Sequence, residues 1–284
     1  MALVDGKALM LRAQREHYAL GGFNVQNLEM LQAVVAAAEA ERSPVLLQFN
    51  PANVQHAGLD YAAAMARTAA ERATVPVVLH LDHGVDFRQC VQAVRLGFTS
   101  VMYDGTPFLL AENIAVTREV CAVVHAAGLG VEGEIGQMGG VEEGVFVAEG
   151  EGTMSDPDEA ARYVEETGAD TLAVAVGNQH GMRTAAATLD LARIAAIRAR
   201  VAVPLVIHGG SGVADDLVQA AIRAGVCKFN VATQLNQAFL KGFREVLAAR
   251  PDDNNPRAAL ARARDCVMDV TREKLRVFGS SGKA

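Results

Sequence analysis

Three histidines in this sequence share a local setting, each directly before a glycine and close behind a short apolar run. His83 lies in the segment LHLDHG, His180 in VGNQHG, and His208 in PLVIHGGSG. Neutral imidazoles bind divalent transition metals, and three of them leave coordination positions open for a substrate. If the three runs are strands that end on one side of a sheet, the pattern predicts a metal site, with Zn²⁺ as the expected ion.

Carboxylates accompany these histidines at the ends of the same kind of run. Asp82 directly precedes His83, Asp104 follows the run VMY, and Glu134 lies in VEGEIG. Because neighbouring strand residues alternate faces, we expect Asp82 to point differently from His83. A carboxylate there could exchange a proton with a substrate oxygen, or it could orient a histidine ligand, and both roles stay open.

Two further segments have the composition of anion-binding turns. The first is a glycine-rich turn that leads towards a helix near Val213, and the second follows the last apolar run of the alternating pattern. Their candidate residues are Gly209, Gly210 and Ser211 in the first, and Asn230, Val231, Ala232 and Thr233 in the second. Backbone N–H groups at helix starts favour phosphate, and barrels often bind phosphate after strands seven and eight.

The alternation of short apolar runs with longer Ala-rich segments predicts the fold. Eight runs are strand candidates: Tyr18–Phe23, Val45–Phe49, Val75–His80, Ser100–Tyr103, Gly130–Gly133, Thr171–Val176, Pro204–His208 and Val226–Asn230. Eight strands alternating with helices favour a closed (β/α)₈ TIM barrel, which typically needs about 250 residues. We therefore predict one α/β domain over residues 1–284, with an extra C-terminal helix at about Pro256–Phe278.

The connections between these runs differ in character. Helix-length stretches lie between the runs, such as Leu28–Arg42, Phe108–Ala127, Pro157–Thr167 and Asp215–Ala224. The segment Ile135–Ser155 instead is long, rich in Gly and Glu, and without clean periodicity. Such a long connection in a compact domain is usually a lid or a binding element, the alternative being a surface insertion.

Composition excludes several classes of protein. The net charge is -7 without basic runs, which argues against nucleic-acid binding. No apolar run approaches the roughly 20 residues that span a bilayer, so no membrane association is expected. The four cysteines lie far apart and form no CxxC pair, which argues against a disulfide framework. We expect a reduced, cytoplasmic protein.

Taken together, the motifs resemble the class II, zinc-dependent ketose-bisphosphate aldolases over nearly the whole chain. GGFNVQN, HLDHG, VGNQHG, HGGSG, NVAT and the FGSSGKA tail occur in order at spacing similar to that family. The members it looks most like act on fructose 1,6-bisphosphate and tagatose 1,6-bisphosphate. The resemblance implies reversible cleavage to dihydroxyacetone phosphate and an aldehyde, glyceraldehyde 3-phosphate.

The resemblance also implies residue roles. His83, His180 and His208 match the zinc ligands, and Asp104 and Glu134 match positions for a second or displaced metal. Asp82 matches the residue that protonates or, in cleavage, deprotonates the oxygen on the aldehyde half of the substrate. Glu142 matches the glutamate that exchanges a proton with the carbon of dihydroxyacetone phosphate. The positions that match substrate contacts are Asn24, Gly181, Gly209 to Ser211, Asn230 to Thr233 and Arg257. A monovalent cation, Na⁺ or K⁺, is often near that cradle, and Arg257 implies a homodimer or homotetramer.

Three stretches depart from the family pattern near the variable part of the substrate. Met182, Arg183 and Thr184 stand where an aromatic residue and a lysine are usual, and MYDGT and Asn50–Asn53 are also unusual. They leave the identity of the sugar open.

Three other functions stay open beside the metal aldolase. Lys228, on the same strand face as Asn230, would be needed for a Schiff-base aldolase. A metal-dependent hydrolase on the same barrel and a non-catalytic sugar-phosphate-binding protein are the further alternatives.

Overall fold

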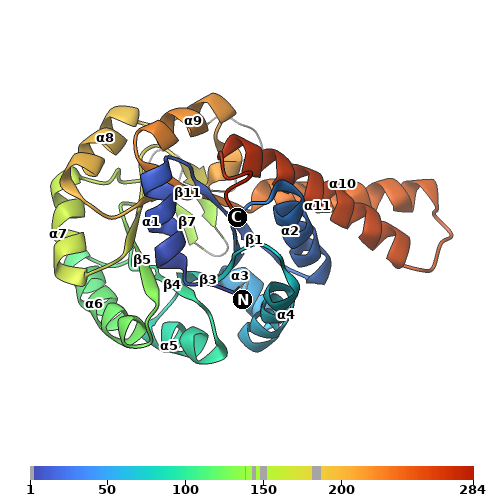
Figure 1. The fold of residues 1–284 in the computed structure, drawn as a ribbon, viewed down its shortest axis with the longest axis horizontal. Helices are drawn as coiled ribbons and strands as arrows, with labels where there is room; N and C mark the ends of the chain where they lie inside the picture. Colours follow the sequence, from blue (N-terminus) through green and yellow to red (C-terminus); the bar gives the residue numbers. More distant parts are fainter. Residues whose placement is uncertain (1–2, 138, 143–144, 148–151, 181–186) are drawn as a thin grey trace.

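The computed structural model is a closed parallel barrel surrounded by helices (Figure 1). It describes residues 3–137, 139–142, 145–147, 152–180 and 187–284, with the backbone alone for residues 139–142, 145–147 and 179–180. Around the barrel the strands follow the order β1-β11-β10-β8-β5-β4-β3-β2. Their bounds are β1 Leu20–Asn24, β2 Val45–Phe49, β3 Val77–Gly84, β4 Ser100–Tyr103, β5 Gly130–Ile135, β8 Thr171–Val174, β10 Leu205–Ile207 and β11 Val226–Val231. The predicted TIM barrel is confirmed.

Helices cover the outside of this barrel, and the strands bury apolar side chains against them. The helices are α2 Leu28–Glu41, α3 Pro51–Ala57, α4 Leu59–Arg72, α5 Phe87–Leu96, α6 Leu110–Ala126, α7 Pro157–Thr167, α8 Leu191–Arg200, α9 Asp215–Arg223 and α10 Thr233–Ala249. Fully buried residues such as Phe23, Val77 and Ile207 belong to this outer core. α7 begins at Pro157 as predicted, and Asp156 caps it, since its side chain accepts hydrogen bonds from the N–H groups of Asp158 and Glu159.

One end of the barrel is closed by α1 (Gly6–Glu16), a helix that the sequence analysis did not predict. Leu9, Met10 and Ala13 of α1 pack into a cluster with interior residues of the strands, including Leu46 and Val206. The strands run parallel and α1 packs against their N-terminal halves, so the open mouth of the barrel is at their C-terminal ends. That mouth is where active sites of such barrels lie.

The extra C-terminal helix is confirmed as α11 (Arg257–Val277). It packs against α10 and α2, and Figure 1 shows the α10–α11 pair extending away from the barrel as an arm.

The long segment after β5 is not uniformly irregular. Its strands β6 (Gly139–Glu142) and β7 (Val145–Val147) form an antiparallel pair, and β6 also pairs with β9 (Gln179–His180). No helix in the described part of the chain is long and apolar enough to cross a membrane.

Candidate active site

The C-terminal end of β3 brings two neighbouring side chains into the barrel mouth. His83 has a left-handed backbone, with φ of 50°, and the pairing of β3 with β4 shifts register between Leu81 and Gly84. Ligand atoms of Asp82, His83 and His208 consequently lie within 4.8 Å of one another. The two side chains nevertheless have different partners, since Asp82 is bound by Asn24 and Asn230 whereas His83 contacts Asp104.

His83 and His208 face each other across this mouth. Their ring centroids are 4.6 Å apart at an interplanar angle of 64°, and both residues are buried. A second group of donor atoms overlaps the first, since His83 Nδ1 lies 2.9 Å from Asp104 Oδ2 and 3.7 Å from Glu134 Oε2. Asp104 is held in turn by the hydroxyl of Thr106 at 2.7 Å. The structure thus brings together four of the five predicted metal ligands.

Asp82 is fixed by two amides at the top of the barrel. Asn24 Nδ2 donates to its Oδ2 at 2.7 Å, and Asn230 Nδ2 donates to its Oδ1 at 2.9 Å. Burial opposes ionisation of Asp82, but the electrostatic effects of His83, Lys228 and His208 and the hydrogen bond from Asn24 together lower the pKa of this carboxyl. Asn24 and Asn230, predicted from the resemblance to contact substrate, are both engaged in holding this carboxylate.

A layer of polar residues lies beneath the mouth and was largely missed by the sequence analysis. Lys228 of β11, fully buried, forms an ion pair with Glu132 of β5 at 2.8 Å. Because β11 and β5 are not neighbours in the barrel, this pair crosses its interior. His80 of β3 is fully buried in this layer, with Nδ1 at 2.8 Å from Ser100 Oγ, and burial lowers its pKa well below the ordinary value. Glu132 and Glu134 are two residues apart, so strand periodicity could have shown that both face inward.

The two predicted anion-binding turns lie side by side after β10 and β11. Gly209, with φ of 66°, begins the short 3₁₀ turn Gly210–Gly212, and Ser211 Oγ accepts a hydrogen bond from Gln234 N of α10 at 3.3 Å. A Cβ on Gly210 would come within 2.7 Å of Asn230 O, so the close contact between the turns requires glycine there.

The helix starts beside these turns differ from one another. Val231 ends β11, Ala232 is the N-cap of α10 and provides no side-chain cap, and Thr233 is the first helical residue. The helix expected near Val213 is α9, which begins at Asp215 with Asp215 and Asp216 in its first turn. Acidic residues there disfavour a bound anion, so the 3₁₀ turn and the start of α10 are the better phosphate site.

Comparison with known proteins agrees with this geometry. The family model for class II fructose-bisphosphate aldolase matches residues 4–283. The chain belongs to the class II fructose-bisphosphate aldolase family. A fructose-bisphosphate aldolase of Geobacillus stearothermophilus is 41% identical over 288 residues, covering 100% of this chain and 99% of that protein. The resemblance found in the sequence is thereby confirmed, and the chain is a class II aldolase, a carbon–carbon lyase.

Solved structures of similar proteins support the same assignment. The YdjI aldolase of Escherichia coli K12 superposes with a TM-score of 0.85 at 35% identity, covering 99% of each chain. A structure from Coccidioides immitis, assigned provisionally as a fructose-1,6-bisphosphate aldolase, has a TM-score of 0.89 at 31% identity and covers 98% of this chain and 97% of its own. Both similar structures are therefore described as aldolases. The name of the second specifies fructose 1,6-bisphosphate as the substrate, and the name of the first specifies no substrate.

Class II aldolases generally depend on a metal, and the donor atoms in this mouth fit one. Asp82, His83 and His208 form one possible ligand group, and His83, Asp104 and Glu134 form another. Both combine imidazole nitrogen with carboxylate oxygen in a buried position, which suits a divalent transition ion. The residues present therefore fit the cofactor that the family implies.

Several predicted site residues cannot be placed in this cluster. His180 lies in β9 beside Gly140 and Glu142 lies in β6 beside Val145, but their side chains are outside the described residues. Gly181, and the departures Met182, Arg183 and Thr184, lie outside them entirely. Arg257 is exposed at the start of α11, where its Nε donates to Asn255 Oδ1 at 3.1 Å, and among the described residues no hydrogen bond or ion pair joins it to the mouth.

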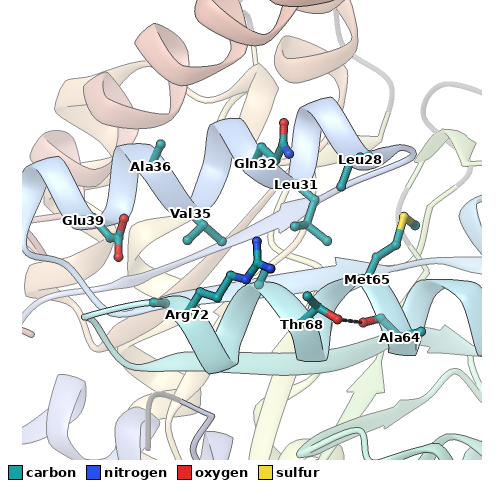
Figure 2. Close-up of a pocket in the computed structure, with 12 residues that line it drawn as sticks. Leu28, Leu31, Gln32, Val35, Ala36, Glu39, Ala64, Met65, Thr68 and Arg72 are labelled. Carbon is teal, nitrogen blue, oxygen red and sulfur yellow. Dashed lines mark hydrogen bonds between the residues drawn. The ribbon is translucent and has the colours of Figure 1, made fainter.

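A separate groove of about 450 Å³ lies on the outer surface between α2 and α4 (Figure 2). Its walls are mainly apolar, with Leu31 and Val35 from α2 and Met65 from α4, and Glu39 and Arg72 add opposite charges. It holds neither a histidine nor a pair of carboxylates, so it offers no groups for the aldol reaction. The catalytic assignment therefore belongs to the barrel mouth.

Proposed function

We propose that this class II aldolase is metal-dependent and reversibly cleaves a ketose 1,6-bisphosphate, either fructose or tagatose 1,6-bisphosphate. The products are dihydroxyacetone phosphate and glyceraldehyde 3-phosphate. The observation that carries the proposal is the convergence of Asp82, His83 and His208, whose ligand atoms lie within 4.8 Å of one another at the barrel mouth. Imidazole ligands beside an immobilised carboxylate provide both a metal site and a proton-transfer group.

Zn²⁺ is the ion we propose for this site, held by His83, His208 and His180. Asp104 and Glu134, which share His83 with the first group, would hold a second or displaced ion. A bound divalent ion supplies Lewis-acid chemistry by polarising the ketone oxygen and stabilising negative charge next to it. Glu134 and Asp104 also orient His83 through Nδ1, at 3.7 and 2.9 Å.

Two carboxylates of the chain would move the protons of the reaction. Asp82, fixed by Asn24 and Asn230, would take the proton from the hydroxyl oxygen of the aldehyde half during cleavage. Glu142 would exchange a proton with the carbon of dihydroxyacetone phosphate. Its strand β6 pairs with β9, the strand that contains His180, which supports a position of this segment over the site.

The phosphate of dihydroxyacetone phosphate would bind at the 3₁₀ turn and the start of α10. Gly181, Gly209, Gly210, Ser211, Val231, Ala232 and Thr233 form the proposed cradle, with Asn24 and Asn230 at its inner edge. Support comes from the hydrogen bond that joins Ser211 to Gln234 and from the absence of a side-chain cap on Ala232. A monovalent cation, Na⁺ or K⁺, would sit near this cradle.

Arg257 would bind the distal phosphate in the site of a neighbouring subunit, because it lies on the arm that leaves its own barrel (Figure 1). We therefore propose a homodimer or homotetramer, acting in the cytoplasm on a small phosphorylated sugar.

A second candidate keeps the reaction and changes the sugar. Met182, Arg183 and Thr184 replace the aromatic residue and lysine usual for the family, which favours a different phosphorylated ketose. The hydrolase and the non-catalytic binding protein are less well supported, because the family and the relative from Geobacillus stearothermophilus are aldolases.

The test is to measure release of dihydroxyacetone phosphate by the purified, zinc-loaded protein. Fructose 1,6-bisphosphate, tagatose 1,6-bisphosphate and fructose 1-phosphate would be compared under the same conditions. The proposal predicts that one bisphosphate has the highest kcat/KM and that borohydride with substrate does not inactivate the protein. Release from none of the three would contradict the proposed substrates, and inactivation by borohydride would support a Schiff base on lysine.

A further inference from the structure

A continuous chain of hydrogen bonds runs through the barrel interior directly beneath the proposed metal site. It links Ser100, His80, Lys228, Glu132 and His208, which come from β4, β3, β11, β5 and the end of β10. The exposed fraction is 0% for His80, Lys228 and His208 and 3% for Glu132. Water therefore does not compete for these groups, and their polar atoms depend on partners within the protein.

Donor and acceptor roles along this chain follow from the chemistry of lysine. An ammonium only donates, and Lys228 Nζ lies 2.8 and 3.0 Å from the two oxygens of Glu132 and 3.4 Å from His80 Nε2. His80 Nε2 must then accept, which leaves its Nδ1–H to donate to Ser100 Oγ at 2.8 Å. The charge of Lys228 thus decides which group donates and which accepts in each of these hydrogen bonds.

The same argument continues to His208 on the other side of the lysine. Glu132, as the carboxylate of an ion pair, only accepts, and its Oε1 lies 3.0 Å from His208 Nε2. His208 Nε2 must therefore carry the proton. The other ring nitrogen, Nδ1, is left as the basic nitrogen, and it faces the mouth with Glu134 Oε2 at 3.6 Å.

From these contacts we propose that the buried Lys228–Glu132 pair is a positioning device, which holds His208 as the Nε2–H tautomer and directs Nδ1 to the metal. The inference rests on the metal site of the proposed function. In this proposal Lys228 acts by holding Glu132 and, through it, His208, and it forms no covalent bond to substrate. A carboxylate behind a histidine ligand fixes the tautomer and orientation of the ring.

The packing around the lysine supports a dedicated role for this pair. A Cβ on Gly22 of β1 would lie 1.8 Å from Gln48 Oε1 and 3.0 Å from Lys228 Cε, so β1 leaves room here by carrying glycine. A buried ion pair often adds little to stability compared with apolar residues of similar size. Its presence at the level directly below His208 is therefore better explained by orientation of the ligand than by stability.

The first experiment reads the tautomer in the intact, metal-free protein. Histidine ¹⁵N NMR at pH 8, with His208 assigned by comparison with His208→Gln, should show a protonated Nε2 and an unprotonated Nδ1. A protonated Nδ1 on His208 would overturn the proposal whatever the enzyme does.

The second experiment measures the Kd for Zn²⁺ by competition with a chromophoric chelator. Glu132→Gln should weaken binding about 10- to 100-fold, because an amide can present either an oxygen or an N–H group to His208. The double variant, Glu132→Gln with Lys228→Met, leaves no unpaired buried charge and should fold while showing a similar loss.

Asp170→Asn is the matched control, because Asp170 also joins a lysine and a histidine. It lies 2.7 Å from Lys7 Nζ and 2.8 Å from His125 Nε2, remote from the metal site. Its Kd for Zn²⁺ should equal that of the parent. If the double variant and the parent bind Zn²⁺ equally, the positioning role is wrong, whereas a parent that binds no Zn²⁺ would contradict the proposed function as well.

Discussion

At the scale of single residues, the position of Asp82 is decided by its two amide partners. Asn24 and Asn230 each occupy one carboxylate oxygen, at 2.7 and 2.9 Å. Since an amide N–H cannot accept a proton, these contacts keep Asp82 as an acceptor while fixing its direction. The carboxylate is therefore suited to take a proton from a substrate placed on the metal.

Asp82→Asn tests whether this group moves a proton or binds the metal. We expect kcat to fall about 10²- to 10⁴-fold with the zinc content unchanged, because the amide has lost its basic oxygen. Steady-state kinetics and metal analysis of the same preparation give both quantities. Loss of zinc with an unaltered kcat per bound metal would instead identify Asp82 as a ligand.

The structure brings four of the donors predicted from residue types at strand ends to one mouth, but the local backbone geometry there could not be predicted from the sequence. Asp82 was expected to point differently from His83, and donor atoms of the two lie within 4.8 Å of each other. His83 has a left-handed backbone, with φ of 50°, at the place where the pairing of β3 with β4 shifts register, and nothing in the sequence HLDHG alone indicates that conformation. Glu132 was overlooked because its importance comes from Lys228, a residue far along the chain that lies across the barrel.

At the scale of elements, the turns after β10 and β11 act as one unit. Ser211, buried in the first turn, accepts a hydrogen bond from the first turn of α10, which leaves its hydroxyl hydrogen available to an anion.

Ser211→Ala should raise KM for dihydroxyacetone phosphate in the condensation direction about tenfold, the effect of losing one hydrogen bond to a charged group. Ser43→Ala is the control, since Ser43 is equally buried but bonds Ser280 near the C-terminus, at 2.9 Å. An equal KM for Ser211→Ala and its parent would remove this hydroxyl from the phosphate site.

Helices α2 and α11 are joined through Glu41 at the end of α2. Arg276 and Arg272 of α11 and the hydroxyl of Ser281 bond to this carboxylate. The hydrogen bond from Arg276 is the main cause that lowers the pKa of Glu41 from 4.5 to about 2, against a smaller opposing effect of burial. Because the folded-state pKa is lowered, the stabilisation is present above pH 4.5 and is lost as pH falls towards 2.

Glu41→Gln should accordingly lower Tm at pH 7, and the difference from the parent should shrink as pH is lowered from 5 to 3. Thermal unfolding followed by circular dichroism gives both trends. Glu245→Gln, which breaks one exposed pair between α10 and α11, should change Tm little at any pH. If the difference in Tm between Glu41→Gln and the parent stayed constant with pH, the charge of Glu41 would not stabilise the fold.

The eight barrel strands could be predicted because each is a short apolar run between turn residues. The elements that the sequence analysis missed lack that signal. Helix α1 places only Leu9, Met10 and Ala13 towards the barrel among many charges, and β6 lies in a Gly- and Glu-rich segment without periodicity. Their structure depends on tertiary packing and pairing, which one sequence does not display.

At the scale of the whole molecule, the α10–α11 arm is the feature that a single barrel does not explain. Arg257 is the first residue of α11 in this arm (Figure 1), and the role proposed for it involves a second subunit.

Arg257→Ala should raise KM for the bisphosphate at least tenfold while leaving KM for fructose 1-phosphate unchanged, because only the bisphosphate has a distal phosphate. Arg264→Ala, on the same helix with an exposed side chain, is the matched control. Sedimentation equilibrium should show a dimer or tetramer for both variants. Equal KM values for Arg257→Ala and its parent, or a monomeric parent, would contradict action across subunits.

Carbon–carbon cleavage by this protein should require metal held at the barrel mouth. The most direct measurement removes metal with EDTA, exchanges the chelator out, and follows dihydroxyacetone phosphate release from the preferred bisphosphate as Zn²⁺ is added back. The structure predicts that release stops in the metal-free protein and returns in proportion to bound Zn²⁺. Release that continues at its original rate in protein shown by metal analysis to be metal-free would show that cleavage does not depend on metal.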